Sequence, residues 1–308
     1  MNGSEFIVGL LAASIRISTP YLLATLGEMF AERSGILNLG IEGMMFFGAL
    51  AAFLGTYFTG SLAVGLVAGI LAGVLLGLLL GVTTITLGLS QHVVGLGIFA
   101  FASGLGMYIY RLSIGTPVRP PAIQAFQPLV IPILSDIPLI GPIFFKQYAI
   151  TYVAFMLVPV CSFVLYRTGF GLGLRAVGER PGAADTVGIS VARTRYIAVV
   201  LAAGFAGLAG AFLSIVQLNT FVPDIIHGRG WICIALVVFG YWQPARIMWG
   251  ALLFGLLDAC QLRLQGFGWN VPYQYFMMLP YVLTIVILAL FQKRARAPGA
   301  LLVPYRRE

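Results

Sequence analysis

Few residues of this chain have side chains that could do chemistry, and the most unusual group of them lies in residues 32–45. That stretch reads Glu-Arg-Ser-Gly-Ile-Leu-Asn-Leu-Gly-Ile-Glu-Gly-Met-Met. Asn38 and Glu42 are four positions apart, so a helix would present them on one face. The glycines that flank them are Gly35, Gly40 and Gly43. Glycine-broken helices are tolerated inside membranes where their backbone lines a cavity or packs on protein, and an intramembrane carboxylate is a functional hypothesis by default.

Two interpretations of Glu42 are open. In the first, Asn38 and Glu42 border a path for a solute, and Phe46 and Phe99 supply its aromatic walls. In the second, Glu42 lies near the cytoplasmic end of its helix and pairs with Arg33. A carboxylate that is buried in the membrane without a partner is costly. Glu42 should therefore have a partner or carry a proton in either case.

The remaining polar residues indicate no active site. Gln91 and His92 lie at the end of an apolar run, where an interfacial role is expected. Asp258 is expected to pair with Arg263, about 1.4 helical turns later. The sequence contains no Walker loop, no metal-ligand cluster and no Ser/His/Asp set on one plausible surface. Three cysteines in apolar runs, without metal-ligand spacing, favour a packing role: Cys161, Cys233 and Cys260. The chain is therefore predicted to bind no metal and not to be an enzyme.

Composition places these residues in a membrane protein. The mean hydropathy is +0.98, and 60% of the residues are hydrophobic. Only 9% are charged, against roughly 25% in a soluble domain. A β-barrel is excluded because the apolar runs are continuous and do not alternate. A nucleic-acid partner is rejected despite the net charge of +8, because Lys and Arg lie mainly at the ends of apolar runs. We expect an all-α polytopic transmembrane bundle that forms a single domain, residues 1–308.

A membrane-spanning helix needs roughly 20 apolar residues, and about nine segments of the chain are predicted to span. They are 6–29, 36–58, 62–88, 92–112, 148–166, 196–218, 230–242, 246–264 and 272–292. The seventh segment is short, so it is either a span or a half-helix paired with the next one.

The distribution of Lys and Arg predicts the orientation. With the loop 167–195 in the cytoplasm, twelve basic residues lie on that side and five lie outside. The N-terminus is then outside, the segment 113–147 is an extracytoplasmic loop, and residues 293–308 are a basic cytoplasmic tail. Seven prolines exclude a continuous helix in 113–147. Its scattered apolar residues suggest that it packs on the membrane domain, as a structural cap or as a surface for a soluble partner.

Two segments are rich in small residues. The predicted span 62–88 has a glycine at every fourth position: Gly65, Gly69, Gly73, Gly77 and Gly81. The segment 202–211 reads Ala-Ala-Gly-Phe-Ala-Gly-Leu-Ala-Gly-Ala. Both patterns let another helix approach at backbone distance. They predict either close helix packing or a surface on which helices slide.

The loop 167–195 contains a short predicted helix. Pro181 suits its first position and Gly188 suits its C-terminal stop. Ala183, Ala184 and Val187 are expected on one outward face. Such a helix is about 10 Å long, too short to span the membrane. Its small apolar side chains suit close packing against a binding partner.

Several motifs resemble the permease subunits of bacterial ABC importers. The match is closest to the simple-sugar and nucleoside branch of the branched-chain amino acid/ribose-type permease superfamily. The first motif is residues 32–45. The second reads Gly-Leu-Arg-Ala-Val-Gly-Glu-Arg-Pro-Gly-Ala-Ala-Asp at 173–185, with Gly-Ile at 188–189. Three more follow: Gly-Arg-Gly-Trp-Ile-Cys-Ile-Ala-Leu at 228–236, Phe-Gly-Tyr-Trp-Gln-Pro at 239–244 and Leu-Pro-Tyr-Val-Leu-Thr at 279–284. The resemblance covers nearly the whole chain. One departure is Phe99, near which that branch often carries an asparagine.

The resemblance implies a permease subunit in the bacterial cytoplasmic (inner) membrane that carries a nucleoside or a simple sugar, with a nucleoside preferred. The short helix is then a coupling helix that docks on a separate ATPase subunit. The residues of this coupling element are Gly178, Glu179, Pro181, Ala183, Ala184, Asp185 and Gly188. ATP would be bound by the ATPase subunit, and this chain would need no cofactor.

The resemblance also implies a second, related permease subunit and an extracytoplasmic substrate-binding lipoprotein. The alternative is a secondary, ion-coupled transporter of a small polar solute. Such a transporter needs a relay of charges inside the membrane, and Glu42 and Asp258 are too few to form a convincing one.

Overall fold

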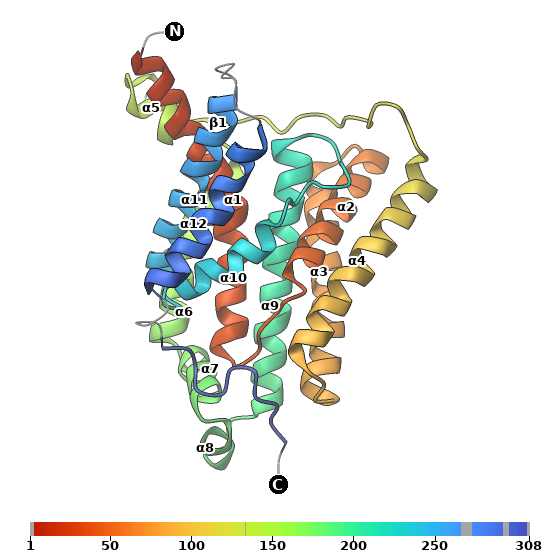
Figure 1. Ribbon diagram of the computed structural model, residues 1–308, viewed down its shortest axis with the longest axis vertical. Coiled ribbons are helices and arrows are strands. Elements are labelled where there is room, and N and C mark those ends of the chain that lie inside the picture. The colour runs from red at the N-terminus through yellow and green to blue at the C-terminus, as the bar shows by residue number, and fades with distance from the viewer. Residues whose placement is uncertain (1–2, 133, 266–272, 292–295, 307–308) are drawn as a thin grey trace.

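The computed structural model describes residues 3–132, 134–265, 273–291 and 296–306, and long helices dominate it (Figure 1). These helices are α1 (Gly3–Arg33), α2 (Ile41–Thr59), α3 (Leu62–Gly81), α4 (Gln91–Ile114), α6 (Ala149–Arg167), α9 (Val191–Ala211), α11 (Pro244–Gln265) and α12 (Tyr273–Phe291). Among the described residues, the seven from α1 to α11 are long and apolar enough to cross a membrane. The predicted all-α polytopic fold is confirmed.

The predicted count of nine spans is approximate, because the segment expected at 230–242 forms only a short helix. This helix, α10 (Arg229–Phe239), has 11 residues and is about 17 Å long. The hydrocarbon core of a bilayer is about 30 Å thick, so α10 is too short to cross it. A turn at 240–243 connects it to α11. The structure thus supports the half-helix interpretation.

Two helices begin inside the bundle, each after a non-helical segment. Residues 34–40, here the first break, lead from α1 into α2. Residues 218–228, the second break, lead from η3 (Phe212–Gln217), at the end of α9, into α10. In Figure 1 the first break rises from the end of the molecule where the C-terminus lies, and the second break descends from the end where the N-terminus lies. The two segments therefore enter the bundle from opposite ends.

Small residues pack the centre of the bundle. The glycine ladder of α3, which continues into η1 (Val82–Thr86), lies against the small-residue segment of α9. A Cβ atom at Gly73 would clash with the Ala203 carbonyl oxygen, and one at Gly207 would clash with the Gly69 carbonyl oxygen. Only glycine permits such backbone contact between helices. The two predicted small-residue segments therefore pack directly against each other.

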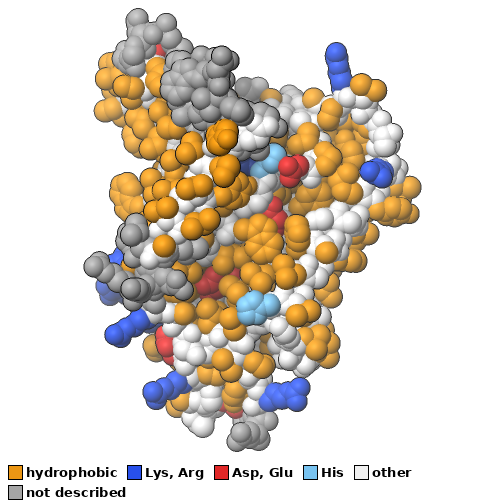
Figure 2. Space-filling model, viewed as in Figure 1, with side chains coloured by type: hydrophobic (Ala, Val, Ile, Leu, Met, Phe, Trp, Pro, Cys, Tyr) orange, Lys and Arg blue, Asp and Glu red, His pale blue; other side chains and the backbone are white. Residues whose placement is uncertain are grey.

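Two short helices lie between α6 and α9, at the end of the molecule where the C-terminus lies (Figure 1). They are α7 (Gly169–Glu179) and α8 (Pro181–Thr186), and we call this end the α8 end. Figure 2 shows Lys and Arg side chains gathered mainly near this end, and hydrophobic side chains along the flanks between the two ends. This asymmetry is the one that the positive-inside rule expects.

The opposite end is covered by the segment between α4 and α6. It contains β1 (Leu129–Val130), η2 (Leu134–Asp136), α5 (Ile140–Phe144) and β2 (Lys146–Gln147), and β1 pairs with β2 in antiparallel fashion. The prediction that prolines prevent a continuous helix here is confirmed. Contacts on both sides of the segment anchor it on the bundle: the Gln147 side chain donates to the Ala12 carbonyl oxygen (3.2 Å), and Ala122 forms a β-bridge with Thr220 of the second break.

Candidate translocation site and coupling surface

Glu42 lies in the first turn of α2 and caps the start of α10. Its two carboxylate oxygens accept hydrogen bonds from the backbone N–H groups of Gly228 (2.8 Å) and Gly230 (2.6 Å). The first N–H groups of a helix have no partner within it and carry the positive end of the helix dipole, so a carboxylate stabilises this position. A Cβ atom at Gly230 would lie 2.7 Å from the Glu42 Cα atom. The two helices approach this closely because residue 230 is glycine.

The second interpretation of Glu42, a pair with Arg33, is wrong. Arg33 instead donates to the carbonyl oxygen of Trp242 (3.3 Å), in the turn between α10 and α11. The partners of Glu42 are backbone groups 186 and 188 residues further along the chain. Glu42 therefore joins the two helices that begin inside the bundle.

Arg229, the first residue of α10, connects that helix to a second buried carboxylate. Asp258 of α11 accepts hydrogen bonds from the Arg229 guanidinium (3.4 Å) and from the Tyr21 hydroxyl (2.9 Å). The Arg229 guanidinium carbon also lies 5.9 Å from the centroid of the Tyr21 ring. The expected pair of Asp258 with Arg263 is wrong, because Arg263 donates to the carbonyl oxygen of Phe6 (2.9 Å). The start of α10 is thus held by one carboxylate of α2 and one of α11.

Buried side chains of α1 and α4 hold the first break. Glu28 accepts a hydrogen bond from the N–H group of Asn38 (2.9 Å). Gln91 accepts one from the N–H group of Leu37 (2.8 Å) and donates one to the carbonyl oxygen of Gly35 (3.4 Å). The sequence predicted an interfacial role for Gln91, and this prediction is wrong. The side chain is buried and bonds to the backbone of the first break.

The Asn38 side chain supports the first break from within. It is fully buried, and its Oδ1 atom accepts a hydrogen bond from the N–H group of Gly40 (3.0 Å). Its Nδ2 atom lies 3.3 Å from the sulfur of Met44. These contacts stabilise the turn that leads into α2. A role of Asn38 in contacting a solute stays a prediction.

A polar stripe on α1 was not anticipated. Tyr21, Thr25, Glu28 and Glu32 lie 4, 3 and 4 positions apart and are all buried, so they share one face of the helix. Glu32 accepts a hydrogen bond from the indole N–H of Trp242 (2.7 Å). The signal that reveals the stripe is its helical spacing, because polar residues inside a span face protein or water rather than lipid.

The two predicted aromatic walls lie in different places. Phe99 of α4 is half-buried and contacts Trp231, in the first turn of α10, edge to face, with the ring centroids 5.8 Å apart. Phe46 of α2 is buried and contacts Phe221 of the second break in the same manner, at 5.4 Å. The structure therefore places Phe99 beside the first turn of α10 and Phe46 beside the second break.

The second break presents polar groups at the surface just before α10. The Nδ1 atom of His227 lies 2.9 Å from a carboxylate oxygen of Asp224, and the side chains of Asp224 and His227 are 81% and 48% exposed. Tyr281 of α12 donates a hydrogen bond to the carbonyl oxygen of His227. Figure 2 shows acidic and histidine side chains among the hydrophobic side chains of this face. Because His227 precedes Gly228, whose N–H group donates to Glu42, these polar groups adjoin the capped start of α10.

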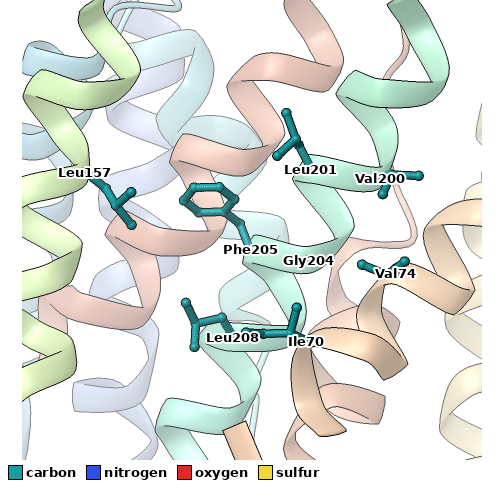
Figure 3. A pocket seen from close by; sticks show the side chains of 8 residues that line it. All are labelled: Ile70, Val74, Leu157, Val200, Leu201, Gly204, Phe205 and Leu208. Carbon is teal, nitrogen blue, oxygen red and sulfur yellow. The ribbon is translucent and has the colours of Figure 1, made fainter. Parts of the chain in front are cut away.

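A cavity of about 270 Å³ lies elsewhere, between α3, α6 and α9 (Figure 3). It is lined by Ile70, Val74, Leu157, Val200, Leu201, Gly204, Phe205 and Leu208. None of these side chains donates or accepts hydrogen bonds, so the cavity does not suit a hydroxyl-rich solute.

In the described part of the chain, no three His, Cys, Asp or Glu residues are grouped to hold a metal ion. The candidate translocation site is therefore the joint of α2 and α10.

The short helix of the predicted coupling element forms as expected. Pro181 is the first residue of α8. Gly188 lies just beyond its end with φ of +85°, the left-handed conformation that commonly ends a helix.

The exposed face of α8 differs from the predicted one. Ala184 is 3% exposed and packs in a small buried cluster with Val177 and Val191, so its predicted outward position is wrong. Ala183 and Val187 are exposed. Consecutive helical residues point about 100° apart, so Ala183 and Ala184 do not share one outward direction.

Three predicted coupling residues contact the C-terminal tail, residues 296–306. The hydrogen bonds run from the Ala300 N–H group to the Gly178 carbonyl oxygen (2.8 Å), from the Gly299 N–H group to the Glu179 carboxylate (3.2 Å) and from the Tyr305 hydroxyl to the Asp185 carboxylate (3.1 Å). The tail therefore lies directly on α7 and α8.

Comparison with known proteins connects this geometry to a family. A family model described as "Branched-chain amino acid transport system / permease component" matches residues 10–288. The "Putative glucose ABC transporter permease protein TsgC13" of Haloferax volcanii is 40% identical, over 99% of both chains. The guanosine ABC transporter permease protein NupQ of Bacillus subtilis is 36% identical over 95% of both chains. The nucleoside ABC transporter permease protein NupC of Lactococcus lactis is 34% identical over 97% of both chains. No solved structure matches the chain.

The family match covers most of the chain and includes both breaks and α8. Membership of an ABC permease family implies an ATPase partner, which binds ATP, and a substrate-binding partner. This chain belongs to the branched-chain amino acid transport system / permease component family: it is a multi-pass permease subunit of an ABC importer in the cytoplasmic membrane, and not an enzyme.

Proposed function

We propose that this chain forms part of the path by which an ATP-driven importer moves a nucleoside, and that the start of α10 borders that path. The observation that carries the proposal is the joint at Glu42, where two helices that begin inside the bundle are bonded together. Broken helices in transporters place helix ends and backbone groups where a solute binds, near the middle of the membrane. Asn38, Glu42, Phe46 and Phe99 remain the proposed path residues, and Trp231 joins them.

The chemistry at the start of α10 suits a nucleoside. The half-buried rings of Phe99 and Trp231 offer aromatic surface on which a flat base can stack, an interaction worth about 1–3 kcal/mol per base. Asp224 and His227 add hydrogen-bonding groups for sugar hydroxyls. A site with aromatic surface and few polar groups binds a neutral solute weakly enough to release it.

The relatives support two solute classes. Those named for guanosine and for nucleosides are 36% and 34% identical to this chain, which supports a nucleoside. The glucose-named relative is 40% identical, which favours a simple sugar as the second candidate. A sugar has no flat base, so its transport should depend little on Trp231 and strongly on hydroxyl contacts.

We further propose that the α8 end faces the cytoplasm and that α8 docks on a separate ATPase subunit. The exposed Ala183 and Val187 would lie in the interface, and the basic residues near this end agree with the orientation. The segment 113–147 would face outside, where a substrate-binding lipoprotein delivers the solute. A second, related permease subunit would complete the path.

Uptake by the complete transporter, reconstituted in proteoliposomes with ATP on the α8 side, tests the proposal. Guanosine should accumulate, and excess glucose should not compete with it. Trp231→Ala should lower the uptake rate about tenfold or more if base stacking is lost. The matched control is Trp249→Ala, because Trp249 of α11 is 65% exposed. Uptake that needs no ATP and stops with a protonophore would support the ion-coupled alternative. Competition by glucose, with no effect of Trp231→Ala, would favour the simple sugar.

A further inference from the structure

We infer that the C-terminal tail is a strap that ties the coupling helices to the first break, so that a movement of α8 reaches α2 through it. The strap is residues 299–305. It bonds to α7, α8, α9 and the first break. The inference rests on the proposed docking of α8 on an ATPase subunit.

One side of the strap is attached to the coupling helices. Its first residues bond to the end of α7, and its Tyr305 hydroxyl donates to Asp185 of α8 (3.1 Å). The Tyr305 ring also packs on the buried cluster formed by Val177, Ala184 and Val191. Because Ala184 is the buried residue of α8, the strap contacts the face of α8 that lies away from the proposed docking face. A displacement of α8 therefore displaces Tyr305 with it.

The other side of the strap is attached to the first break. The Leu302 N–H group donates to the carbonyl oxygen of Gly35 (3.1 Å). Arg195 of α9 donates to both segments, from Nε to the carbonyl oxygen of Ser34 (3.1 Å) and from Nη1 to that of Val303 (3.2 Å). The strap and the first break thus share one buried cation.

Arg195 couples the position of the strap to the position of the first break. Only 2% of this residue is exposed, so its guanidinium has lost most of its water, and carbonyl oxygens replace it. Removal of the strap takes away the Val303 acceptor and leaves Arg195 bonded to Ser34 of the first break, so the link between the two segments is lost. A shift of the strap should move Arg195 and with it the first break, which leads to Asn38 and Glu42.

The test uses the complete reconstituted transporter with a chain that ends at Ala297, with Tyr305→Phe, and with the exposed Arg306→Gln as the matched control. We would measure co-purification of the ATPase subunit, ATP hydrolysis, and solute molecules transported per ATP. The truncated chain should keep the ATPase subunit and basal ATP hydrolysis but lose about tenfold in transport per ATP, within the usual range of coupling between sites. Tyr305→Phe removes one hydrogen bond and should lose about two- to fivefold. Arg306→Gln should match the wild type.

Ala183→Trp, measured in parallel, separates this inference from the docking of α8. If Ala183→Trp loses the ATPase subunit while the truncated chain transports as much solute per ATP as the wild type, docking stands and the strap is overturned. If Ala183→Trp keeps the ATPase subunit and full transport, the proposed docking is itself wrong, and the strap falls with it. If the truncated chain does not reach the membrane, the Tyr305→Phe variant provides the test. If this variant transports as many solute molecules per ATP as the wild type, the inference of a strap is wrong.

Discussion

The first break and the second break each lead into a helix that begins inside the bundle, yet they are built differently. The first break is almost entirely buried, and Glu28, Gln91 and Arg195 bond to its backbone from three helices. The second break is partly exposed. Its backbone is bonded partly to the segment 113–147, where the Ile123 N–H group donates to the carbonyl oxygen of Asn219 (2.9 Å), and partly to the side chains of Glu42 and Tyr281.

This difference suggests a division of labour between the two breaks. A buried segment whose backbone groups are bonded to three helices transmits a displacement instead of absorbing it. A partly exposed segment with polar side chains can be reached by a solute and can adjust to it. Glu42 lies in the first turn of the helix after the first break and caps the helix after the second break, so it connects the two breaks. Four predictions test this comparison.

Substitution at the joint should have the largest effect. Glu42→Leu leaves two N–H groups of α10 without acceptors, each at a cost of about 1–3 kcal/mol. We expect the initial rate of uptake to fall about a hundredfold or more at an unchanged protein level. Glu42→Gln keeps one acceptor oxygen and should be milder. Asp224→Asn alters the exposed contact of Asp224 with His227 in the second break and should change uptake by about twofold at most. Wild-type uptake by Glu42→Leu would show that the two breaks work independently.

Alanine at the left-handed glycine of each break should destabilise the first break more than the second. Gly35 and Gly228 have φ of +94° and +73°, so an alanine is strained at both positions by about 1–2 kcal/mol. At Gly35 the added Cβ atom would also lie 2.9 Å from the Ala300 carbonyl oxygen, which is backbone. At Gly228 it would lie 3.0 Å from the Tyr281 hydroxyl oxygen, the end of a side chain that can rotate. Gly35→Ala should therefore lower the melting temperature of the detergent-purified protein further, and equal shifts would remove the difference in rigidity.

Substitution of one asparagine in each break should lower solute uptake more in the first break than in the second, by a smaller factor than Glu42→Leu does. Asn38→Ala removes a buried acceptor of the Gly40 N–H group, which costs about 1 kcal/mol. We expect uptake below half-saturation to fall roughly fivefold at equal protein level, by that same free energy. Asn219 of the second break has φ of +55°, so Asn219→Gly relieves strain and should leave uptake unchanged. A loss of uptake in Asn219→Gly, without one in Asn38→Ala, would reverse the assignment of the two breaks.

Labelling with cysteine should assign each break to its side of the membrane without changing activity. Gln127→Cys, in the segment beside the second break, should react with an impermeant thiol reagent in intact cells. Gly182→Cys, in α8, should react only after permeabilisation. Cys161 and Cys233 are buried, so Cys260→Ser removes the more accessible native thiol. Labelling in the opposite pattern would place the second break towards the cytoplasm.

The sequence predicted the helices well because lipid imposes long, continuous apolar runs. The span expected at 148–166 is α6, Ala149–Arg167, and the glycine ladder marked the contact between α3 and α9. The start and stop of α8 were predictable because proline and glycine have strong backbone preferences. Its buried face was not, because a helix of 6 residues is too short for a hydrophobic pattern to show which side is covered.

The partners of the buried charges could not be predicted for a different reason. One of the two interpretations paired Glu42 with Arg33, and Asp258 was expected to pair with Arg263; each is the nearest opposite charge in the sequence. In the structure Glu42 binds backbone N–H groups, which every residue except proline possesses, so the sequence holds no pattern to detect. Arg229, the partner of Asp258, lies 29 residues before it in another helix, and only the packing of α10 against α11 brings the two together.

The direct contact between the backbones of α3 and α9 also limits how these positions can change in evolution. A core leucine that becomes larger or smaller is accommodated by neighbours that adopt other rotamers. Gly73, Gly207 and Gly69 have no side chains to rotate, and the atoms that they meet are mainly backbone atoms. A new side chain there can fit only if a whole helix is displaced. Each substitution at these three glycines should therefore either be accepted with a displaced helix or abolish folding, with no intermediate effect. The exposed glycines Gly97 and Gly104 of α4, where an added Cβ atom would meet no neighbouring described residue within 4 Å, should accept alanine freely.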